Sequence, residues 1–326
     1  MRRYSWLFFV IILLVLFGFG HVSGSIGDRL RVFRQNLVDC IQSNCSDQNT
    51  YYQNKPFYLQ LLRWDCVSEC RYESQWRTLE YLKKSKILKV PQFYGKWTFY
   101  RFFGIQEPAS FFFSILNLLA NLRGWKQYRT IGILCNDRYY NVWKLQAILA
   151  INAWFWSIIY HSRDCPFTEK LDYFSAYLTI IYSLFTITFK YLSELFDPNN
   201  DLTAQITIAI PFATIYLYHV NYLTTVRFDY GYNLRVNLLT GIGSTLGWLV
   251  WCLHHRKNRT HVKQCVISLI FLNLCLILEV LDFAPIFNTF DAHSLWHCGT
   301  ILFPFLWYKF LQQEAKHLAL QAKRDQ

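Results

Sequence analysis

The hydrophobic positions gather into long blocks that fill the last two thirds of the chain. Seven blocks approach the length of about 20 residues that an α-helix needs to cross the hydrocarbon core of a membrane. We therefore expect an all-α membrane protein, a bundle of seven transmembrane helices. Asn117 and Asn121 interrupt the first block, which makes it the weakest of the seven. The blocks cover residues 108–123, 143–161, 172–191, 204–223, 234–254, 265–283 and 295–312.

The first 24 residues have the pattern of a secretory signal peptide. Arg2 and Arg3 precede the apolar run from Trp6 to Phe19, and small residues follow at 23–25. An uncleaved membrane anchor is the alternative, because the apolar run is long for a signal peptide. Either interpretation places the next segment in the lumen of the secretory pathway.

A polar segment at residues 25–105 carries four closely spaced cysteines. After a signal peptide such cysteines predict two disulfides, and three pairings of Cys40, Cys45, Cys66 and Cys70 are possible. Zinc binding by the same cysteines is the alternative, but an oxidising lumen disfavours it. Asn44 begins an Asn-Cys-Ser sequon and is a candidate glycosylation site, although a disulfide at Cys45 would hinder its use. We expect a small disulfide-stapled lumenal segment.

The basic residues orient the bundle. The chain has a formal net charge of +12, and no nucleic-acid motif accompanies it, so nucleic-acid binding is disfavoured. With a lumenal N-terminus, the loops after the first and fifth blocks and the tail lie in the cytoplasm, where Lys and Arg concentrate in membrane proteins. This asymmetry supports an odd number of spans. The cytoplasmic set is Arg123, Lys126, Arg129, Arg138, Arg256, Lys257, Arg259, Lys263, Lys316, Lys323 and Arg324.

Four parts follow from these patterns: a signal peptide at 1–24, a lumenal segment at 25–105, a membrane bundle at 106–312 and a cytoplasmic tail at 313–326.

Within the bundle, three histidines stand at the same depth. His161 ends the second block, and His293 and His297 begin the seventh with the four-residue spacing of one helix face. Ionisable residues inside a membrane are rare and usually functional. Three imidazoles with an open fourth position are typical of catalytic zinc, so zinc is the expected cofactor.

Two residues near these histidines suggest hydrolytic chemistry. Zinc lowers the pKa of a bound water, and Asp172, which opens the third block, is the candidate to take its proton. The alternative for Asp172 is an ion pair with Arg163 or Lys170. Ser157 stands one helical turn before His161 and is the candidate to stabilise a developing oxyanion.

Two further carboxylates are candidates to orient the histidine rings. Asp164 follows His161 closely, and Asp291 precedes His293 by two residues. Asp291 is alternatively a helix cap. A hydrolytic metal between apolar helices, beneath a lumenal surface, is best suited to an acyl bond in a lipid.

The sequence around these residues resembles the Per1-like family. The upstream runs V-P-Q-F-Y-G-K-W (90–97) and Q-E-P-A-S (106–110) contribute, and the similarity extends over roughly residues 60–310. The resemblance rests on the runs N-A-W-F-W-S-I-I-Y-H-S-R-D (152–164), T-E-K-L-D-Y-F (168–174), R-F-D-Y-G-Y-N-L (227–234) and D-A-H-S-L-W-H (291–297).

This family belongs to the CREST superfamily, with alkaline ceramidases and the progestin/adipoQ receptors. The resemblance implies a seven-helix fold with a zinc-dependent hydrolase site. It further implies removal of the unsaturated sn-2 acyl chain from GPI-anchored proteins, a phospholipase A2 type of reaction, in the Golgi membrane or alternatively in the endoplasmic reticulum. A ceramidase-like lipid amidase and a non-catalytic seven-span lipid receptor are the alternatives. The superfamily's Ser, Asp and three His correspond to Ser157, Asp172, His161, His293 and His297.

Overall fold

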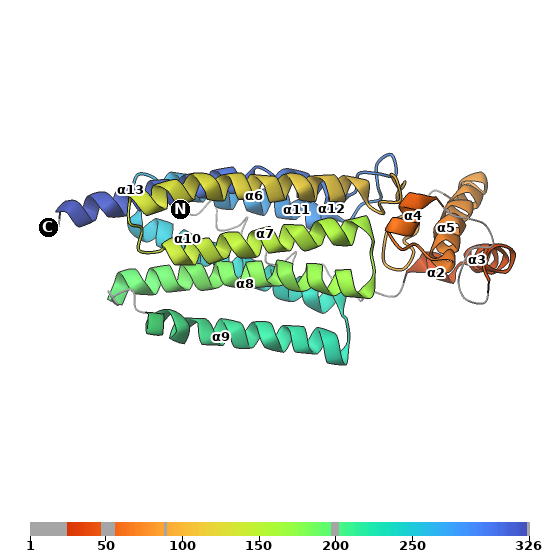
Figure 1. Cartoon of the computed structure of the whole chain (residues 1–326), viewed down its shortest axis with the longest axis horizontal. Coiled ribbons are helices and arrows are strands. Elements are labelled where there is room, and N and C mark those ends of the chain that lie inside the picture. Colours follow the sequence, from red (N-terminus) through yellow and green to blue (C-terminus); the bar gives the residue numbers. More distant parts are fainter. Residues whose placement is uncertain (1–24, 47–55, 88–89, 197–201, 325–326) are drawn as a thin grey trace.

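A computed structural model describes residues 25–46, 56–87, 90–196 and 202–324. The expected signal peptide at 1–24 lies outside these ranges. The described residues form helices joined by turns and isolated bridges, with no sheet among them. Figure 1 shows a long bundle of roughly parallel helices with a small cap of short helices at one end.

Helices α6 to α13 build the bundle. From α6 to α11 neighbours in sequence run back and forth along it, and α13 continues in the direction of α12 (Figure 1). Helix α6 packs on α7 and α13, α8 packs on α7, α9 and α10, and α11 packs on α10, α12 and α13. A π-helical stretch, Tyr222–Val226, continues α9. The helices are α6 (Pro108–Leu134), α7 (Tyr140–Ser162), α8 (Pro166–Phe196), α9 (Leu202–Asn221), α10 (Tyr230–His255), α11 (Val262–Leu281), α12 (Ala292–Thr300) and α13 (Phe303–Arg324).

Four helices in the described residues are long and apolar enough to cross a membrane. They contain the expected spans at 143–161, 204–223 and 234–254 and all but the last two residues of 265–283, whereas the other three expected spans do not pass the same test of length and composition. Helices α6 and α8 are long enough, but polar residues dilute their apolar character. The expected span at 295–312 is divided between the nine-residue α12 and the more polar α13. The four are Tyr140–Ser162, Leu202–Val226, Tyr230–His255 and Val262–Leu281.

Local sequence signals set where several helices begin. Pro108 and Pro166 stand at the first positions of α6 and α8, where a missing N–H costs no hydrogen bond. Asp229 caps α10 by accepting a hydrogen bond from the backbone N–H of Tyr232 (2.9 Å). These starts lie at the end of the bundle that carries the cap, as Figure 1 shows.

Large aromatic side chains fill the middle of the bundle. Trp143, Trp248, Trp251 and Phe310 are each 1% exposed or less. The ring centroids of Trp248 and Trp307 lie 5.0 Å apart in an edge-on arrangement, which adds to the stability gained by burial. This aromatic core connects α7, α10 and α13 and holds their ends in fixed relative positions.

The cap consists of α2 (Ile26–Arg29), α3 (Arg31–Asn44), α4 (Phe57–Leu61) and α5 (Cys66–Lys84). Of the three pairings that the sequence allows, the structure contains Cys40–Cys70 and Cys45–Cys66, so the thiols are not available as zinc ligands. Both disulfides tie α3 and the residue after it to the start of α5. The Asn44 amide donates to Cys40 Sγ (3.4 Å), and its glycosylation stays a prediction.

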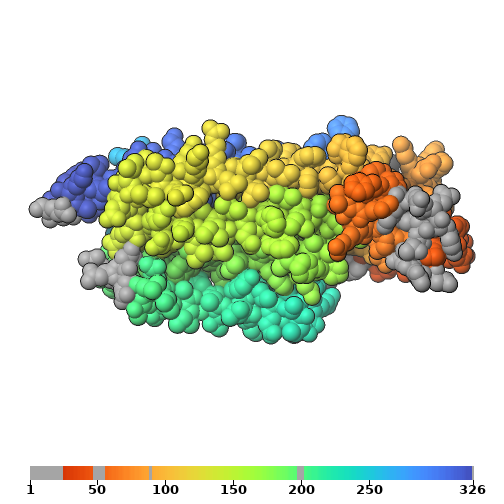
Figure 2. Space-filling model, viewed as in Figure 1, coloured from red at the N-terminus to blue at the C-terminus, as the bar shows by residue number. Residues whose placement is uncertain are grey.

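The cap is joined to the bundle through the loop that leads into α6. The backbone N–H groups of Gln106 and Glu107 donate to the carbonyls of Ser162 and His161, both at 3.0 Å. In the space-filling view the orange cap continues directly onto the yellow and green end of the bundle (Figure 2). The loop therefore lies against the end of α7, at the position of His161.

Close packing of α6 on α13 depends on Gly124, which leads to a stability prediction. A Cβ at this position would come within 2.2 Å of the buried Tyr308 ring, so Gly124→Ala is expected to lower the free energy of unfolding by about 1–3 kcal/mol. Gly241→Ala is the matched control, because no atom lies within 4 Å of its added Cβ. Thermal melts in detergent should show a lower midpoint for the first variant only. Equal midpoints would contradict this packing.

Candidate metal centre

Three histidine rings meet at the cap end of the bundle, one from α7 and two from α12. The candidate ligand atoms of His161, His293 and His297 all lie within 4.8 Å of one another. The Nε2 atoms of His293 and His297 are 2.9 Å apart. The Nε2 atom of His161 is buried and has no hydrogen-bond partner among the described residues. The three rings therefore present nitrogen atoms to one small space.

The other nitrogen of each ring, Nδ1, is held by a polar side chain. Two of these partners are carboxylates and the third is a hydroxyl. Histidines that bind metals usually engage their second nitrogen in this way, which fixes the ring orientation and leaves the Nε2 lone pair free. The pairs are His161 with Glu107 Oε2 (2.8 Å), His293 with Glu279 Oε2 (2.7 Å) and His297 with Ser114 Oγ (3.0 Å).

The donor set fits a zinc ion. When Nδ1 is the protonated nitrogen, each neutral ring turns an Nε2 lone pair toward the others, and such lone pairs repel at 2.9 Å unless a cation lies between them. Imidazole nitrogen is a preferred zinc ligand, and three protein ligands leave the fourth position open, as in catalytic sites. His161 and His297 are 1% and 2% exposed, so bulk water does not screen this arrangement.

Helix α6 supports the site through polar residues on its inner face. Ser157 Oγ lies 3.0 Å from Ser114 Oγ, which in turn contacts the ring of His297. The side-chain amide of Asn117 donates to the backbone carbonyl of His297 at 2.7 Å. Ser157 is buried beside the histidines, one hydrogen bond away from the His297 partner. Asn117, which interrupts the first apolar block, therefore helps to position α12.

Asp172 lies near the start of α8, on the same side of the bundle. Its carboxylate interacts electrostatically with both His161 and His293. Within the described ranges no ion pair joins Asp172 to Arg163 or Lys170. Asp172 thus lies within electrostatic range of two of the histidines, and Ser157 is joined to the third through Ser114; their chemical roles are proposals.

Asp164 occupies a different place from the expected one. The carboxylate that contacts the His161 ring belongs to Glu107, and Asp164 pairs instead with Lys96 (2.9 Å). Lys96 also binds Glu107 at 2.7 Å, so Asp164 acts on the ring only through these two residues. The physical reason is that the backbone turns away after Ser162, where α7 ends.

Asp291 caps α12 and does not hold the His293 ring, which pairs with Glu279. Its carboxylate accepts from the backbone N–H of Ser294 (2.8 Å), and the Ser294 hydroxyl accepts from the N–H of Asp291 (2.9 Å). This reciprocal capping box fixes the first turn of the helix that carries both histidines. Of the two roles considered for Asp291, the structure contains the cap.

Glu107, which is buried, and Lys96, which is partly exposed, form an ion pair at the edge of the site. Burial opposes the charge on Glu107, but the neighbouring Lys96 and His161 outweigh it and hold the pKa of this carboxyl well below its usual range. Burial likewise opposes the charge on Lys96, yet Glu107 and Asp164 raise the pKa of its ammonium group. Glu107 is therefore ionised over the physiological pH range and acts as a permanent anion next to the His161 ring.

Glu107, Glu279 and Ser114 are not among the site residues expected from the sequence. Glu279 had a usable signal, because it is a carboxylate inside the apolar block at 265–283, where an ionisable residue usually has a function. Glu107 stands in a connecting loop, and Ser114 is a common small residue in a helix. Their contacts with the histidines arise only from the tertiary fold.

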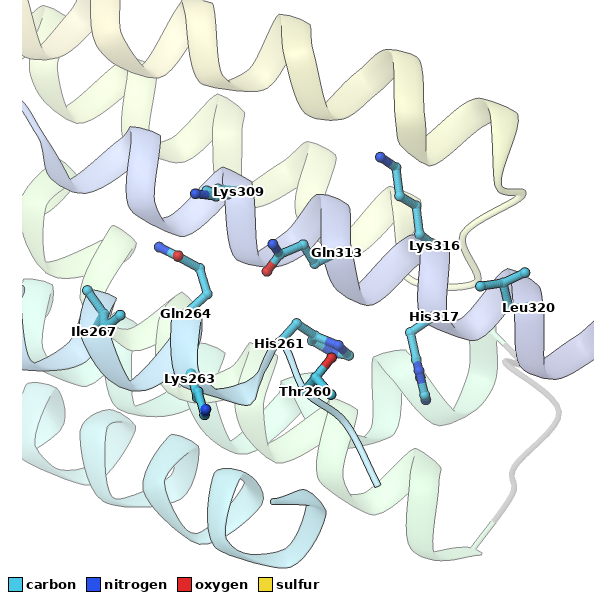
Figure 3. Close-up of a pocket in the computed structure, with 10 residues that line it drawn as sticks. All are labelled: Thr260, His261, Lys263, Gln264, Ile267, Lys309, Gln313, Lys316, His317 and Leu320. Carbon is cyan, nitrogen blue, oxygen red and sulfur yellow. The ribbon is translucent and has the colours of Figure 1, made fainter. Parts of the chain in front are cut away.

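Two cavities among the described residues lie at opposite ends of the bundle, and none of the three histidines lines either of them. The larger of the two, about 440 Å³, lies between α11 and α13 at the end away from the cap. Figure 3 shows the side chains that line it. The smaller, about 180 Å³, lies between the cap and the bundle and is lined in part by Lys96 and Asp164. The smaller cavity is connected to the metal centre indirectly, because its lining residue Lys96 binds Glu107, which contacts the His161 ring.

Comparisons with known proteins agree with the position of these motifs. The model of the Per1-like family matches residues 56–315. A human protein named "GPI-specific phospholipase A2-like PGAP3" is 38% identical over 304 residues, which cover 92% of each chain. A protein of Drosophila melanogaster named "Post-GPI attachment to proteins factor 3" is 36% identical over 293 residues, 88% of each chain. No solved structure has significant similarity to the chain.

Proposed function

The chain belongs to the Per1-like family, and from this premise we propose that it is a zinc-dependent hydrolase that removes the sn-2 acyl chain from the lipid of GPI-anchored proteins. The printed names of its relatives connect those proteins with GPI anchors and with phospholipase A2. One observation carries the hydrolase proposal for this chain: three imidazoles with engaged Nδ1 atoms direct their Nε2 atoms to one shared space.

The roles of the protein's own residues follow from their positions. A zinc ion at the three Nε2 atoms would supply Lewis-acid chemistry, which polarises an ester carbonyl and acidifies water. Asp172 accepts the proton of the attacking water, because its carboxylate interacts electrostatically with His161 and His293 while other carboxylates hold their Nδ1 atoms. Ser157 donates a hydrogen bond to the ester oxygen as negative charge develops there.

We further propose that α6, α8 and the α12–α13 pair also cross the membrane, which makes seven spans with the cap in the lumen. Helices α6 and α8 have 27 and 31 residues, more than the roughly 20 that a span requires. Asn117 of α6 and Lys190 of α8 point into the bundle, where they are 0% and 1% exposed. The basic loops lie at the end opposite the cap, as in a cytoplasmic face, and the disulfides suit an oxidising lumen.

This topology fits a lipid substrate. The histidines then lie in the lumenal half of the bundle, near the depth at which the ester groups of a phospholipid lie. An acyl chain reaches this depth from within the bilayer, whereas a soluble peptide does not. The Golgi membrane is the proposed location, with the endoplasmic reticulum as the alternative.

The direct test is fatty-acid release by the purified full chain in nanodiscs. A GPI lipid with different acyl chains at sn-1 and sn-2 is supplied, and the products are identified by mass spectrometry. The expected result is release of the sn-2 chain alone, its loss on addition of a zinc chelator and its return with added zinc. Release from ceramide instead of the GPI lipid, or no release from the zinc-loaded protein, would contradict the proposal.

A further inference from the structure

The cavity between the cap and the bundle has a lining that the hydrolytic chemistry does not require. It has a volume of about 180 Å³ and is bounded by α5, by the loop at 93–106 and by the turn between α7 and α8. Four basic side chains line it, Arg71, Lys96, Arg101 and Arg163, against the single carboxylate of Asp164. Such an excess of cations in one small space indicates an anionic ligand.

Two of the four cations are already paired with carboxylates. Lys96 binds Glu107 and Asp164, and Arg101 binds Glu69. Arg71 and Arg163, by contrast, form no ion pair within the described ranges. The hydrogen bonds of the Arg163 guanidinium go to neutral acceptors, the backbone carbonyl of Asp164 and the hydroxyl of Ser68. These two arginines are therefore available to an anion from outside the chain.

Unsatisfied donors at the cavity support the same conclusion. The Nε atoms of Arg101 and Arg163 are buried and have no acceptor among the described residues. A buried N–H group without a partner costs stability, so such groups commonly mark a ligand's place. The planar guanidinium presents paired donors that match two phosphate oxygens, which a lysine does not.

Aromatic rings fix these guanidinium groups and offer flat surfaces. The Arg101 and Arg163 groups lie 3.4 and 3.7 Å from the centroid of the Trp64 ring, and Arg71 lies 5.3 Å from that of Tyr94. Tyr94 also lines the cavity and is 49% exposed. The C–H face of an inositol or sugar ring can pack on such a surface while its phosphate contacts the arginines.

A short chain of contacts connects the cavity to the metal centre. Lys96 and Asp164 line the cavity, Lys96 binds Glu107 at 2.7 Å, and Glu107 holds the His161 ring at 2.8 Å. In a phospholipid, only the glycerol unit separates the phosphate from the sn-2 ester. A phosphate bound in the cavity would therefore hold the ester close to the histidines.

We propose that this cavity binds the phosphoinositol unit of the substrate headgroup, with Arg71 and Arg163 on its phosphate. The proposal rests on the proposed function for its assignment of the substrate as a GPI lipid. The excess positive charge disfavours a choline headgroup, because a quaternary ammonium requires an aromatic cage without neighbouring cations. The cavity thus binds inositol lipids in preference to the choline lipids of the same membrane.

Binding of glycerophosphoinositol, which has no acyl chain to hydrolyse, tests the proposal. Titration calorimetry on the purified full chain should show binding of this probe, with weaker binding of glycerophosphocholine and of inorganic phosphate. Arg71→Gln should weaken probe binding about tenfold, the loss of one charge-assisted contact. Arg71 is exposed on α5, so its replacement is compatible with folding, and equal melting midpoints verify this.

Arg77→Gln is the matched control on the same helix. Arg77 is exposed, pairs with Glu73 at 3.4 Å and does not line the cavity, so its replacement should leave probe binding unchanged. Equal binding by wild type and Arg71→Gln, or equal binding of the choline probe, would overturn the inference. Inorganic phosphate that binds as tightly as the probe would overturn the inositol assignment. Probe binding without any acyl release would refute the proposed hydrolase alone.

Discussion

Replacing His297 with alanine is expected to reduce sn-2 fatty-acid release on the order of a thousandfold or more. The change removes one of three ligands, and a catalytic metal supplies several kcal/mol of transition-state stabilisation, at 1.36 kcal/mol for each tenfold in rate. His297 is 2% exposed and its Nδ1 atom is held by Ser114, so no nearby histidine can take its place. Initial rates of release from a GPI lipid measure the effect.

Two further variants separate loss of the ligand from loss of the fold. His254→Ala changes an exposed histidine in the last turn of α10, at the end of the bundle away from the metal centre, and should keep the wild-type rate. His297→Cys replaces one zinc ligand with another and should retain more activity than His297→Ala. A correctly folded His297→Ala protein with wild-type release would exclude this histidine from the reaction.

Replacing Glu107 with glutamine is expected to weaken zinc binding and lower activity about 10- to 100-fold, the usual effect of losing a partner of a metal ligand. The substitution keeps the shape of the side chain but removes the anion that faces His161 at 2.8 Å and Lys96 at 2.7 Å. The His161 imidazole becomes a weaker electron-pair donor to zinc, and Lys96 loses one of its two counter-ions. Competition with a chelating dye measures the apparent zinc affinity.

Glu80→Gln is the control for the Glu107 prediction. Glu80 forms an exposed pair with Lys84 (2.8 Å) on α5, and exposed pairs contribute little. Its replacement should change neither zinc affinity nor release. Unchanged zinc affinity in Glu107→Gln would show that the His161 ring does not depend on this carboxylate.

The helices and the meeting of the histidines could be predicted from sequence. Apolar blocks of spanning length lie within helices α6 to α13, because such blocks have no stable alternative to helix in a membrane. The meeting of His161 with His293 and His297 followed from counting spans, since alternate helices return to the same side. The order of the blocks and the positions of three residues are sufficient for this prediction.

The surroundings of the rings could not be predicted in the same way. Glu107 lies in a loop, and only the backbone hydrogen bonds between this loop and the end of α7 bring it to His161. Asn117 looked like an interruption of an apolar block, yet its amide binds the His297 carbonyl in the interior. Among the described helices, four satisfy the composition test for membrane spans. Helices α6 and α8 do not, because residues that build the site make them more polar.

The most direct test of the central claim is the zinc content of the purified chain by elemental analysis. Wild-type protein is expected to hold about one zinc ion per chain, as a site with three imidazole ligands implies. The variants His161→Ala and His297→Ala should hold much less under the same conditions. Wild-type protein without stoichiometric metal, or variants that keep the full amount, would contradict a metal centre at these histidines.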